Sequence, residues 1–302
     1  MSDTAANLRH KIDSAGDLQG VVRTMKALAA SSISQYENSV HALGDYYRTV
    51  ELGLSACFRA GEPSMSAGHP AAKRTSEADS DIIGAIVFGS DQGLVGQFNE
   101  EVADFAIKTL ASLPGKLQVW AVGERVRERL ADAGLPIAKS FAVPTNVNAI
   151  APLVGQIQIE TETHRANRES SSMYVFHNQP KSGALYEPIS QRLLPLDLQW
   201  QQGLARIPWP TGNLPEILGT GSVALRALIR EYLFISLYRA CAESLASENA
   251  SRLAAMQRAE KNIDELLEDL ASKFHQLRQS SIDEELFDVV AGYELLGKEQ
   301  GH

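Results

Sequence analysis

A seven-residue repeat of apolar residues at each end of the chain constrains the fold more than any other feature. In the N-terminal part, the repeat places Leu8, Ala15, Val22, Ala29, Tyr36, Leu43, Val50 and Cys57 in one series, and Ile12, Gln19, Lys26, Ile33, Val40, Tyr47 and Leu54 in a second series four residues behind it. Sustained 4-3 spacing is typical of a coiled coil, because two helices must underwind slightly to keep such a seam in contact. No proline occurs before Pro63, so the repeat predicts one helix roughly 75 Å long.

The C-terminal third repeats the pattern. One series holds Leu228, Ile235, Ala242, Asn249, Met256, Ile263, Leu270 and Leu277, and the other holds Leu225, Tyr232, Arg239, Ala246, Leu253, Glu260, Leu267 and Phe274. No proline follows Pro215, which allows an unbroken helix roughly 100 Å long. Either helix alone could belong to an ordinary bundle, but together they are expected to pair as an antiparallel coiled coil. The polar seam residues Gln19, Lys26, Arg239, Asn249 and Glu260 are expected to fix its register.

Between the two repeats lies a segment of different character. Apolar runs of the buried-strand type, IIGAIVF (82–88) and LQVWAVG (117–123), each precede a glycine-containing turn and a helical stretch. A strand near IAKSF, a helix within 146–166 and strands at SSMYVFHNQ and YEPISQRLLPL continue the series. This alternation predicts a Rossmann-like α/β domain with a mostly parallel sheet. We therefore divide the chain into an N-terminal coiled-coil helix (1–60), a linker (61–81), the α/β domain (82–210) and a C-terminal coiled-coil helix (211–302).

Composition excludes several classes of function. The net charge of −9 argues against a nucleic-acid coat and against adhesion to anionic lipid. No apolar stretch reaches the ~18–20 residues that a membrane span needs, and the first residues lack a signal sequence, so we expect a cytoplasmic protein with no direct membrane insertion. The two cysteines, Cys57 and Cys241, and the scattered histidines have no metal-ligand spacing, so no metal is expected.

The segment SDQGLVGQFNEE (90–101) is the most plausible place for chemistry, because it joins a strand to a helix as phosphate loops do. It lacks the Gly-Lys-Ser/Thr ending of a P-loop and the glycine spacing of a dinucleotide fingerprint. The simpler interpretation is a tight turn in which Gly93 and Gly96 supply positive φ or close approach. AVGER (121–125) is a weaker turn of the same kind, and no residue is marked as a nucleophile. We expect neither a cofactor nor a catalytic site.

Three stretches of the chain match the motifs of one known family. In the C-terminal helix the matching residues are Ser247, Glu248, Arg252, Ala255, Met256, Asn262, Arg278, Gln279, Ile282, Glu285 and Gly292. In the opening helix they are Leu8, Arg9, Ile12, Met25, Ala29, Ala30 and Ser31, and in the turn Asp91, Gly93, Leu94, Gly96 and Asn99. On these residues, the two ends and the turn resemble the ATP synthase gamma subunits. The family's Lys-Ile-Thr-Lys-Ala-Met is here Gly20-Val-Val-Arg-Thr-Met25, and its Ile-Thr-x-Glu is Ile282-Asp-Glu-Glu285. The chain is also more acidic than many family members.

The resemblance implies a central rotor shaft with no catalysis of its own, which couples ion translocation to ATP synthesis or hydrolysis and regulates both. The implied partners are a ring of three alpha and three beta subunits, an epsilon subunit and a ring of c subunits, at the cytoplasmic face of a bacterial inner membrane. The residues expected to contact the alpha/beta ring are Arg23, Met25, Arg278, Gln279 and Asp283. The turn with Asp91, Gly93 and Gly96 is expected on the side of the epsilon and c subunits.

Two other classes of function stay open at this level. One is a nucleotide-binding Rossmann-like enzyme with helical arms, which would bind ATP or NAD near Gly93. The other is a free-standing coiled-coil adapter that belongs to no rotary complex. Saturable nucleotide binding would favour the enzyme, and failure to co-purify with alpha and beta subunits would favour the adapter.

Overall fold

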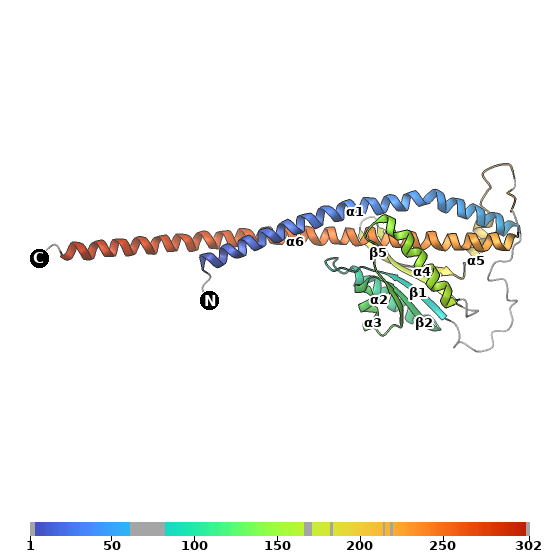
Figure 1. Cartoon of the computed structure of the whole chain (residues 1–302), viewed down its shortest axis with the longest axis horizontal. Coiled ribbons are helices and arrows are strands. Elements are labelled where there is room, and N and C mark those ends of the chain that lie inside the picture. The colour runs from blue at the N-terminus through green and yellow to red at the C-terminus, as the bar shows by residue number, and fades with distance from the viewer. Residues whose placement is uncertain are drawn as a thin grey trace. The chain divides into compact units, whose positions relative to one another are not determined.

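The chain begins and ends in single long helices, as the repeats predict. In the computed structural model, α1 spans Ala5–Arg59 and α6 spans Gly221–Glu299, with 55 and 79 residues respectively. Both helices are continuous over their whole length (Figure 1). A proline inside either span would have removed a backbone hydrogen bond and broken the helix, and neither span contains one.

The structure describes residues 4–60, 82–165, 171–181, 184–213, 215–217 and 220–299. The linker predicted at 61–81 lies outside these residues. Between the two long helices, the elements are β1 (Ile82–Phe88), α2 (Phe98–Ala111), β2 (Lys116–Val122), α3 (Glu124–Asp132), β3 (Ile137–Phe141), the short 3-10 helix η1 (Val147–Ala149), α4 (Ile150–Arg165), β4 (Ser171–Lys181), β5 (Ala184–Leu194) and α5 (Leu198–Ala205).

One five-stranded sheet organises the middle of the chain. Its strand order is β3-β2-β1-β4-β5; the pairs β3–β2, β2–β1 and β1–β4 are parallel, and β4–β5 is antiparallel. The prediction of a mostly parallel sheet is therefore confirmed. The antiparallel edge strand follows from the short connection after Lys181, since parallel neighbours need a long crossover.

Helices cover both faces of this sheet. Side chains that alternate along each strand point to opposite faces. Ile83, Ala85 and Val87 of β1 pack with α2 and α3, whereas Ile86 and Phe88 pack with α4 and α6. Burial on both faces explains why β1 is an uninterrupted apolar run rather than an alternating one.

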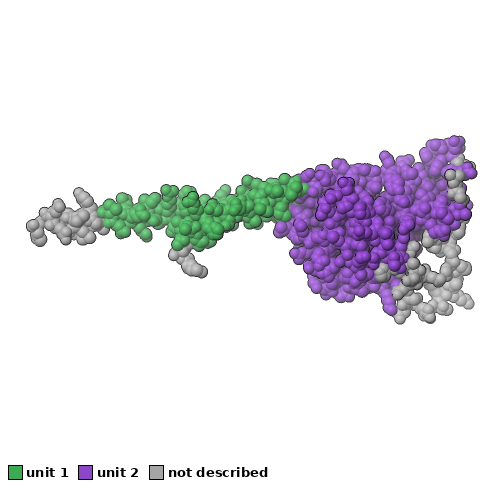
Figure 2. All heavy atoms as spheres, viewed as in Figure 1, with its two compact units in different colours: residues 1–28, 253–302 green, residues 29–252 purple. Residues whose placement is uncertain are grey.

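Contacts group the described residues into two compact units, and both long helices contribute to each. One unit takes its residues from 1–28 and 253–302, and the other comprises 29–252 (Figure 2). The division into domains at 60, 81 and 210 that we drew from the sequence stays a prediction.

In the first unit, the two helices pair in opposite directions. Gln19 donates a hydrogen bond to Asp264, and the Arg23 Nε donates to the Glu260 Oε1 at 2.9 Å. Lys26 also donates to Glu260. As the numbers rise along α1, those of the partners in α6 fall, which defines an antiparallel pair. The predicted register role of Gln19, Lys26 and Glu260 thus has a structural basis, because all three make contacts across the seam.

The apolar seam of this unit is narrower than the two predicted series. Val22, Met256 and Ile263 are buried together, with Met25 and Leu267 packed at their edge. Along α1, the series with Leu8, Ala15 and Val22 is buried, whereas Ile12, Gln19 and Lys26 of the second series are only half-buried. A pair of helices covers one stripe of each partner, so the second series lies at the rim of the contact.

In the second unit, α1 and α6 also run antiparallel. The Tyr46 hydroxyl donates to Glu231 at 2.7 Å, and a Cβ added at Gly53 would lie 2.8 Å from the Cδ2 of Leu228. Here α5 closes the ends of the pair, with Trp200 packed against Tyr232 at 4.7 Å between ring centroids. The sequence analysis did not predict α5, although Asp197 caps its N-terminus by accepting a hydrogen bond from the Gln199 N–H.

No helix among the described residues is long and apolar enough to cross a lipid bilayer.

The buried seam of the first unit generates a stability prediction. Ile263→Ala should lower the free energy of opening of this helix pair by about 2–4 kcal/mol, since it removes a side chain that is only 7% exposed. Leu266→Ala is the matched control, because Leu266 lies on the same helix and is 48% exposed; it should cost no more than about 0.5 kcal/mol. Amide hydrogen exchange in α1 residues 15–28 measures both changes. Equal losses in the two variants would contradict the assigned seam.

Candidate functional site

The turn between β1 and α2, residues 89–97, is the segment that the sequence singled out for chemistry. Gly96 has φ 60°, in the left-handed region, as predicted. Gly93 differs from the prediction: its φ lies outside that region, and a Cβ added there would meet nothing within 4 Å. The other left-handed residue of the turn is Leu94, with φ 63°.

Close approach is instead required at two other glycines. A Cβ on Gly89 would lie 2.4 Å from the Cβ of Val126, and a Cβ on Gly123 would lie 2.8 Å from the backbone of Ser90. Gly123 also has φ 109°. These two glycines let the turns after β1 and β2 pack against each other. The sequence reasoning missed Gly89 because nothing local distinguishes it from Gly93.

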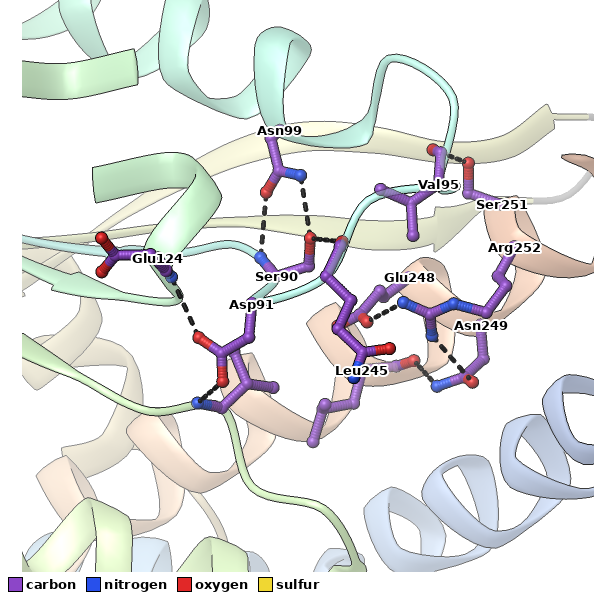
Figure 3. A network of polar contacts seen from close by, with 12 residues as sticks. Ser90, Asp91, Val95, Asn99, Glu124, Leu245, Glu248, Asn249, Ser251 and Arg252 are labelled. Carbon is purple, nitrogen blue, oxygen red and sulfur yellow. Dashed lines mark hydrogen bonds and ion pairs between the residues drawn. The ribbon is translucent and has the colours of Figure 1, made fainter. Parts of the chain in front are cut away.

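Asp91 joins three segments of the domain through its carboxylate. Its Oδ1 accepts the N–H of Glu124, the first residue of α3, and its Oδ2 accepts the N–H of Val143, both at 2.9 Å (Figure 3). A carboxylate at a helix N-terminus is favoured by the unpaired N–H groups and by the helix dipole. Asp91 therefore fixes the turn to α3 and to the segment after β3.

Asn99 closes the same turn from its other end. Its Oδ1 accepts the Ser90 N–H at 2.9 Å, and its Nδ2 donates to the Ser90 Oγ at 2.8 Å. Both residues are buried. The conformation of the turn is thus held by side chains of the chain itself.

This arrangement opposes the interpretation as a phosphate-binding loop. A phosphate would need the N–H groups at a helix N-terminus, but Asp91 already occupies the one at Glu124, and α2 carries Glu100 and Glu101 in its first turn. A nearby cavity of about 240 Å³ has Arg252 as the one basic side chain among the described residues that line it. Glu248 already binds that guanidinium at 2.6 Å.

Helix α6 lies beside the turn and is hydrogen-bonded to it. The Ser251 Oγ donates to the Val95 carbonyl (Figure 3). The Ser247 Oγ donates to the Asn178 carbonyl at 3.0 Å, and the Asn178 Nδ2 donates to the Phe98 carbonyl at 2.9 Å. Through these bonds, α6 is tied to β4 and to the C-terminal part of the turn, at Val95 and Phe98.

Glu248 and Arg252 form a largely buried pair on α6, with side chains 8% and 13% exposed. Arg252 also donates to the Asn249 Oδ1 at 3.5 Å. Burial raises the pKa of Glu248, Arg252 acts against that rise, and the charge of Asp91 adds to it. Glu248 and Arg252 are four residues apart, a spacing that brings opposite charges together on a helix.

A second polar group, in which His177 and Glu243 are buried, joins α6 to β4. The His177 Nε2 lies 2.8 Å from the Glu243 Oε2, and the Arg239 Nε donates to the Glu243 Oε1 at 2.7 Å. Burial alone would raise the pKa of Glu243, but the hydrogen bonds and charges of His177 and Arg239 outweigh it and hold the pKa below its ordinary value. The sequence offered no signal for this contact, because His177 and Glu243 are far apart in the chain.

The residues expected to contact a ring of partner subunits lie in the first unit. Arg23 is exposed but bonded to Glu260, and Met25 is half-buried at the edge of the seam. Arg278, Gln279 and Asp283 are exposed on α6. Large apolar side chains that were not predicted as contacts lie next to Asp283 and follow it along α6; they are Ile282, Leu286, Phe287, Val289 and Val290, each 49–71% exposed.

The structure leaves two expectations about these residues untested. Asp91, Gly93 and Gly96 do lie together in one turn, but their position toward epsilon and c subunits stays a prediction. The roles of Arg23, Met25, Arg278, Gln279 and Asp283 in partner contact stay predictions as well. Among the described residues, no cluster of three or more His, Cys, Asp or Glu side chains could hold a metal ion.

Comparison with known proteins decides between the three classes of function. A family model described as ATP synthase matches residues 4–296. The chain belongs to the ATP synthase gamma-chain family. The ATP synthase gamma chain of Anaeromyxobacter sp. (strain Fw109-5) is 25% identical over 298 residues, which cover 96% of this chain and 98% of that relative. The gamma chain of Lachnoclostridium phytofermentans is 28% identical over 280 residues, 90% of each protein.

The fold agrees with that of a solved ATP synthase structure. A chain of the Euglena gracilis mitochondrial ATP synthase, from a structure of OSCP, F1 and the c-ring, aligns over 99% of this chain and 96% of that one, with a TM-score of 0.66 and 13% identity. The gamma chain is a non-catalytic stalk subunit. The comparisons therefore favour neither the nucleotide-binding enzyme nor the free-standing adapter.

The glycines of the turn provide a matched pair of substitutions. Gly89→Ala should destabilise the 29–252 unit by about 1–3 kcal/mol, because the new methyl group would overlap Val126. Gly93→Ala should change stability by less than about 0.5 kcal/mol, since the space around Gly93 is open and its φ suits alanine. Urea unfolding followed by tryptophan fluorescence measures both. Equal effects would contradict the assigned packing of the two turns.

The His177–Glu243–Arg239 group predicts a pH dependence of stability. Because the folded pKa of Glu243 is lowered, its contribution is present above the unfolded pKa and is lost as the pH falls through the lower folded value. Glu243→Gln should remove this component and cost roughly 3 kcal/mol near neutral pH. Glu162→Gln, which breaks an exposed pair with Arg230, should cost less than about 1 kcal/mol. The measurement is the free energy of unfolding of each variant between pH 3 and 7, about the range of carboxyl titration. If this free energy depended on pH in the same way in both variants, the prediction would be contradicted.

Proposed function

We propose that this chain is the central rotor shaft of an ATP synthase and couples ion translocation in the membrane sector to ATP synthesis or hydrolysis in a ring of alpha and beta subunits. The observation that carries the proposal is the match over residues 4–296, which includes α1, the sheet and all but the last three residues of α6. A relative that shared only the sheet would have left the function open, because one fold supports many functions.

The structure suits a part that transmits torque. A shaft must resist twisting, and two helices joined by contacts across a seam resist it better than one helix. In the first unit, Glu260 accepts hydrogen bonds from both Arg23 and Lys26. In the second unit, α6 is fixed to the sheet by an apolar core and by the bonds of Ser247, Ser251 and Glu243. Force applied to the α/β domain would therefore reach α6 directly.

We propose that Arg278, Gln279 and Asp283 contact the alpha/beta ring, with Arg23 and Met25 as contacts from α1. Gln279 and Asp283 are four residues apart, and Leu286 follows Asp283 by three, so all three lie on one face of α6. A ring that covers the apolar residues of this face would also cover these polar side chains. A bond that forms and breaks as the shaft turns suits exposed polar groups like these.

The proposed location is the cytoplasmic face of a bacterial inner membrane, where the chain is held by its partners. The gamma chains similar to it come from bacteria, and the described residues contain no membrane-spanning helix. The further partners that we propose are the epsilon subunit and the ring of c subunits. In support of the c-ring, the similar Euglena gracilis chain belongs to a structure of OSCP, F1 and the c-ring.

Co-expression with the alpha and beta subunits of the same genome tests the function. The tagged chain should bring down both in stoichiometric amounts. In vesicles that hold the complete complex with its membrane sector, ATP-driven ion pumping should require this chain. Recovery of the chain without them would contradict the proposal.

In the complete complex with its membrane sector, replacing both Arg278 and Gln279 by alanine should lower the ion pumping per ATP hydrolysed, because the ring loses polar contacts to the shaft. The loss of one or two such hydrogen bonds corresponds to about a tenfold weaker contact. Gln257 and Arg258, replaced together by alanine, are the matched control, since they are the same residue types on the same helix and are also exposed. Unchanged coupling in the Arg278/Gln279 variant would remove this pair from the mechanism.

A further inference from the structure

The end of α6 extends past the part of the helix that α1 accompanies. Gln19 lies opposite Asp264, and α1 begins at Ala5, fourteen residues before Gln19 (19 − 5 = 14). In an antiparallel pair, the first residue of α1 therefore lies opposite about residue 278 of α6 (264 + 14), and α6 continues beyond it without α1 beside it. In agreement with this, every side chain from Arg278 to Val290 is exposed.

This unaccompanied stretch carries an apolar face. Leu286, Val289 and Val290 follow Ile282 by four, seven and eight residues, so the four lie on one side of the helix. Phe287, which is 71% exposed, extends the face on one flank. Exposed apolar surface of this kind on a helix indicates a surface that a partner covers.

A carboxylate lies within the apolar face. Leu286, Phe287 and Val290 follow Asp283 by three, four and seven residues, so Asp283 shares their side of the helix. A partner that covers these three side chains also removes water from the carboxylate. A buried carboxylate without an opposite charge or hydrogen-bond donors is strongly unfavourable.

The neighbouring sequence offers Asp283 no cation. There is no Lys, Arg or His from 279 to 290. Arg278 precedes Asp283 by five residues, which places it about 140° away around the helix axis. Three further carboxylates, on Glu284, Glu285 and Asp288, make the surroundings more negative. The compensating charge must therefore come from whatever covers the face.

We infer that the surface closing over this end of α6 presents a lysine or arginine side chain to Asp283, within an otherwise apolar contact to Leu286, Phe287 and Val290. This inference rests on the proposed function, which makes the alpha/beta ring the occupant. The chain has Asp283 where the family motif has threonine, a neutral residue. The ring that accompanies this chain is thus expected to carry a positive charge suited to the aspartate.

The test compares two variants that remove the same charge from the same helix. Asp283→Asn removes the carboxylate on the apolar face. Asp288→Asn removes one that lies five residues further on, about 140° around the helix. Both side chains are exposed, so neither substitution should disturb folding, which circular dichroism would verify. Binding of each variant to the assembled alpha/beta ring of the same organism is measured as a dissociation constant at a series of salt concentrations.

Asp283→Asn should weaken binding to the ring about tenfold or more, because the cation of the ring loses its partner. It should also flatten the salt dependence, whereas Asp288→Asn should bind within about twofold of the unchanged chain. Equal binding by the Asp283→Asn variant and the unchanged chain would overturn the inference and leave the proposed function intact. Equal weakening by both variants would also overturn it, because a general effect of acidity needs no cation at one position. Failure of the unchanged chain to bind the ring would contradict the proposed function itself, and the inference with it.

Discussion

The packing of α6 against the sheet is the interaction on which the rest of the structure depends. Leu237, Cys241 and Leu245 enter the same core as Ile86 and Trp120, and every residue from Ala240 to Asn249 is buried. A helix buried on all sides normally has no polar residues. Here Glu243, Ser247 and Glu248 are buried, and each has a hydrogen-bond partner in the domain or on the helix. This part of the helix therefore belongs to the α/β domain as much as the strands do.

Along the paired helices, apolar and polar contacts have different roles. Val22, Met256 and Ile263 supply the burial that holds the pair together. The bonds of Glu260 with Arg23 and Lys26 lie at the partly exposed rim, where ion pairs add little stability. These bonds instead fix the register of the two helices, since a shift in register would separate Glu260 from both basic side chains. Such a division suits a shaft, whose two helices must keep one alignment under load.

The turn after β1 shows how a Rossmann-like topology can serve a mechanical purpose. In open α/β sheets, ligands bind at the carboxyl ends of the strands, near helix N-termini. Here the Asp91 carboxylate accepts a hydrogen bond from the first N–H of α3, and the Asn99 side chain accepts one from the Ser90 N–H inside the turn. The carbonyl of Val95 binds Ser251 of α6. The edge at which other proteins of this topology hold a cofactor is used in this chain to attach a helix.

The sequence by itself determined the two long helices, the strand-and-helix alternation of the sheet domain and the family, because each depends on a pattern within a short stretch of chain. The antiparallel pairing of the two ends was expected from the same repeats, but its register came from the structure. Repeats of seven residues, apolar runs and motif spacings are all local. The tertiary structure alone decided that α6 completes the core of the sheet, that α5 closes the pair, and that Gly89 rather than Gly93 is sterically required. It also decided that His177 meets Glu243, and that Asp91 binds Glu124 and Val143. Each of these depends on which distant segments come together, and that is set by burial of the whole core.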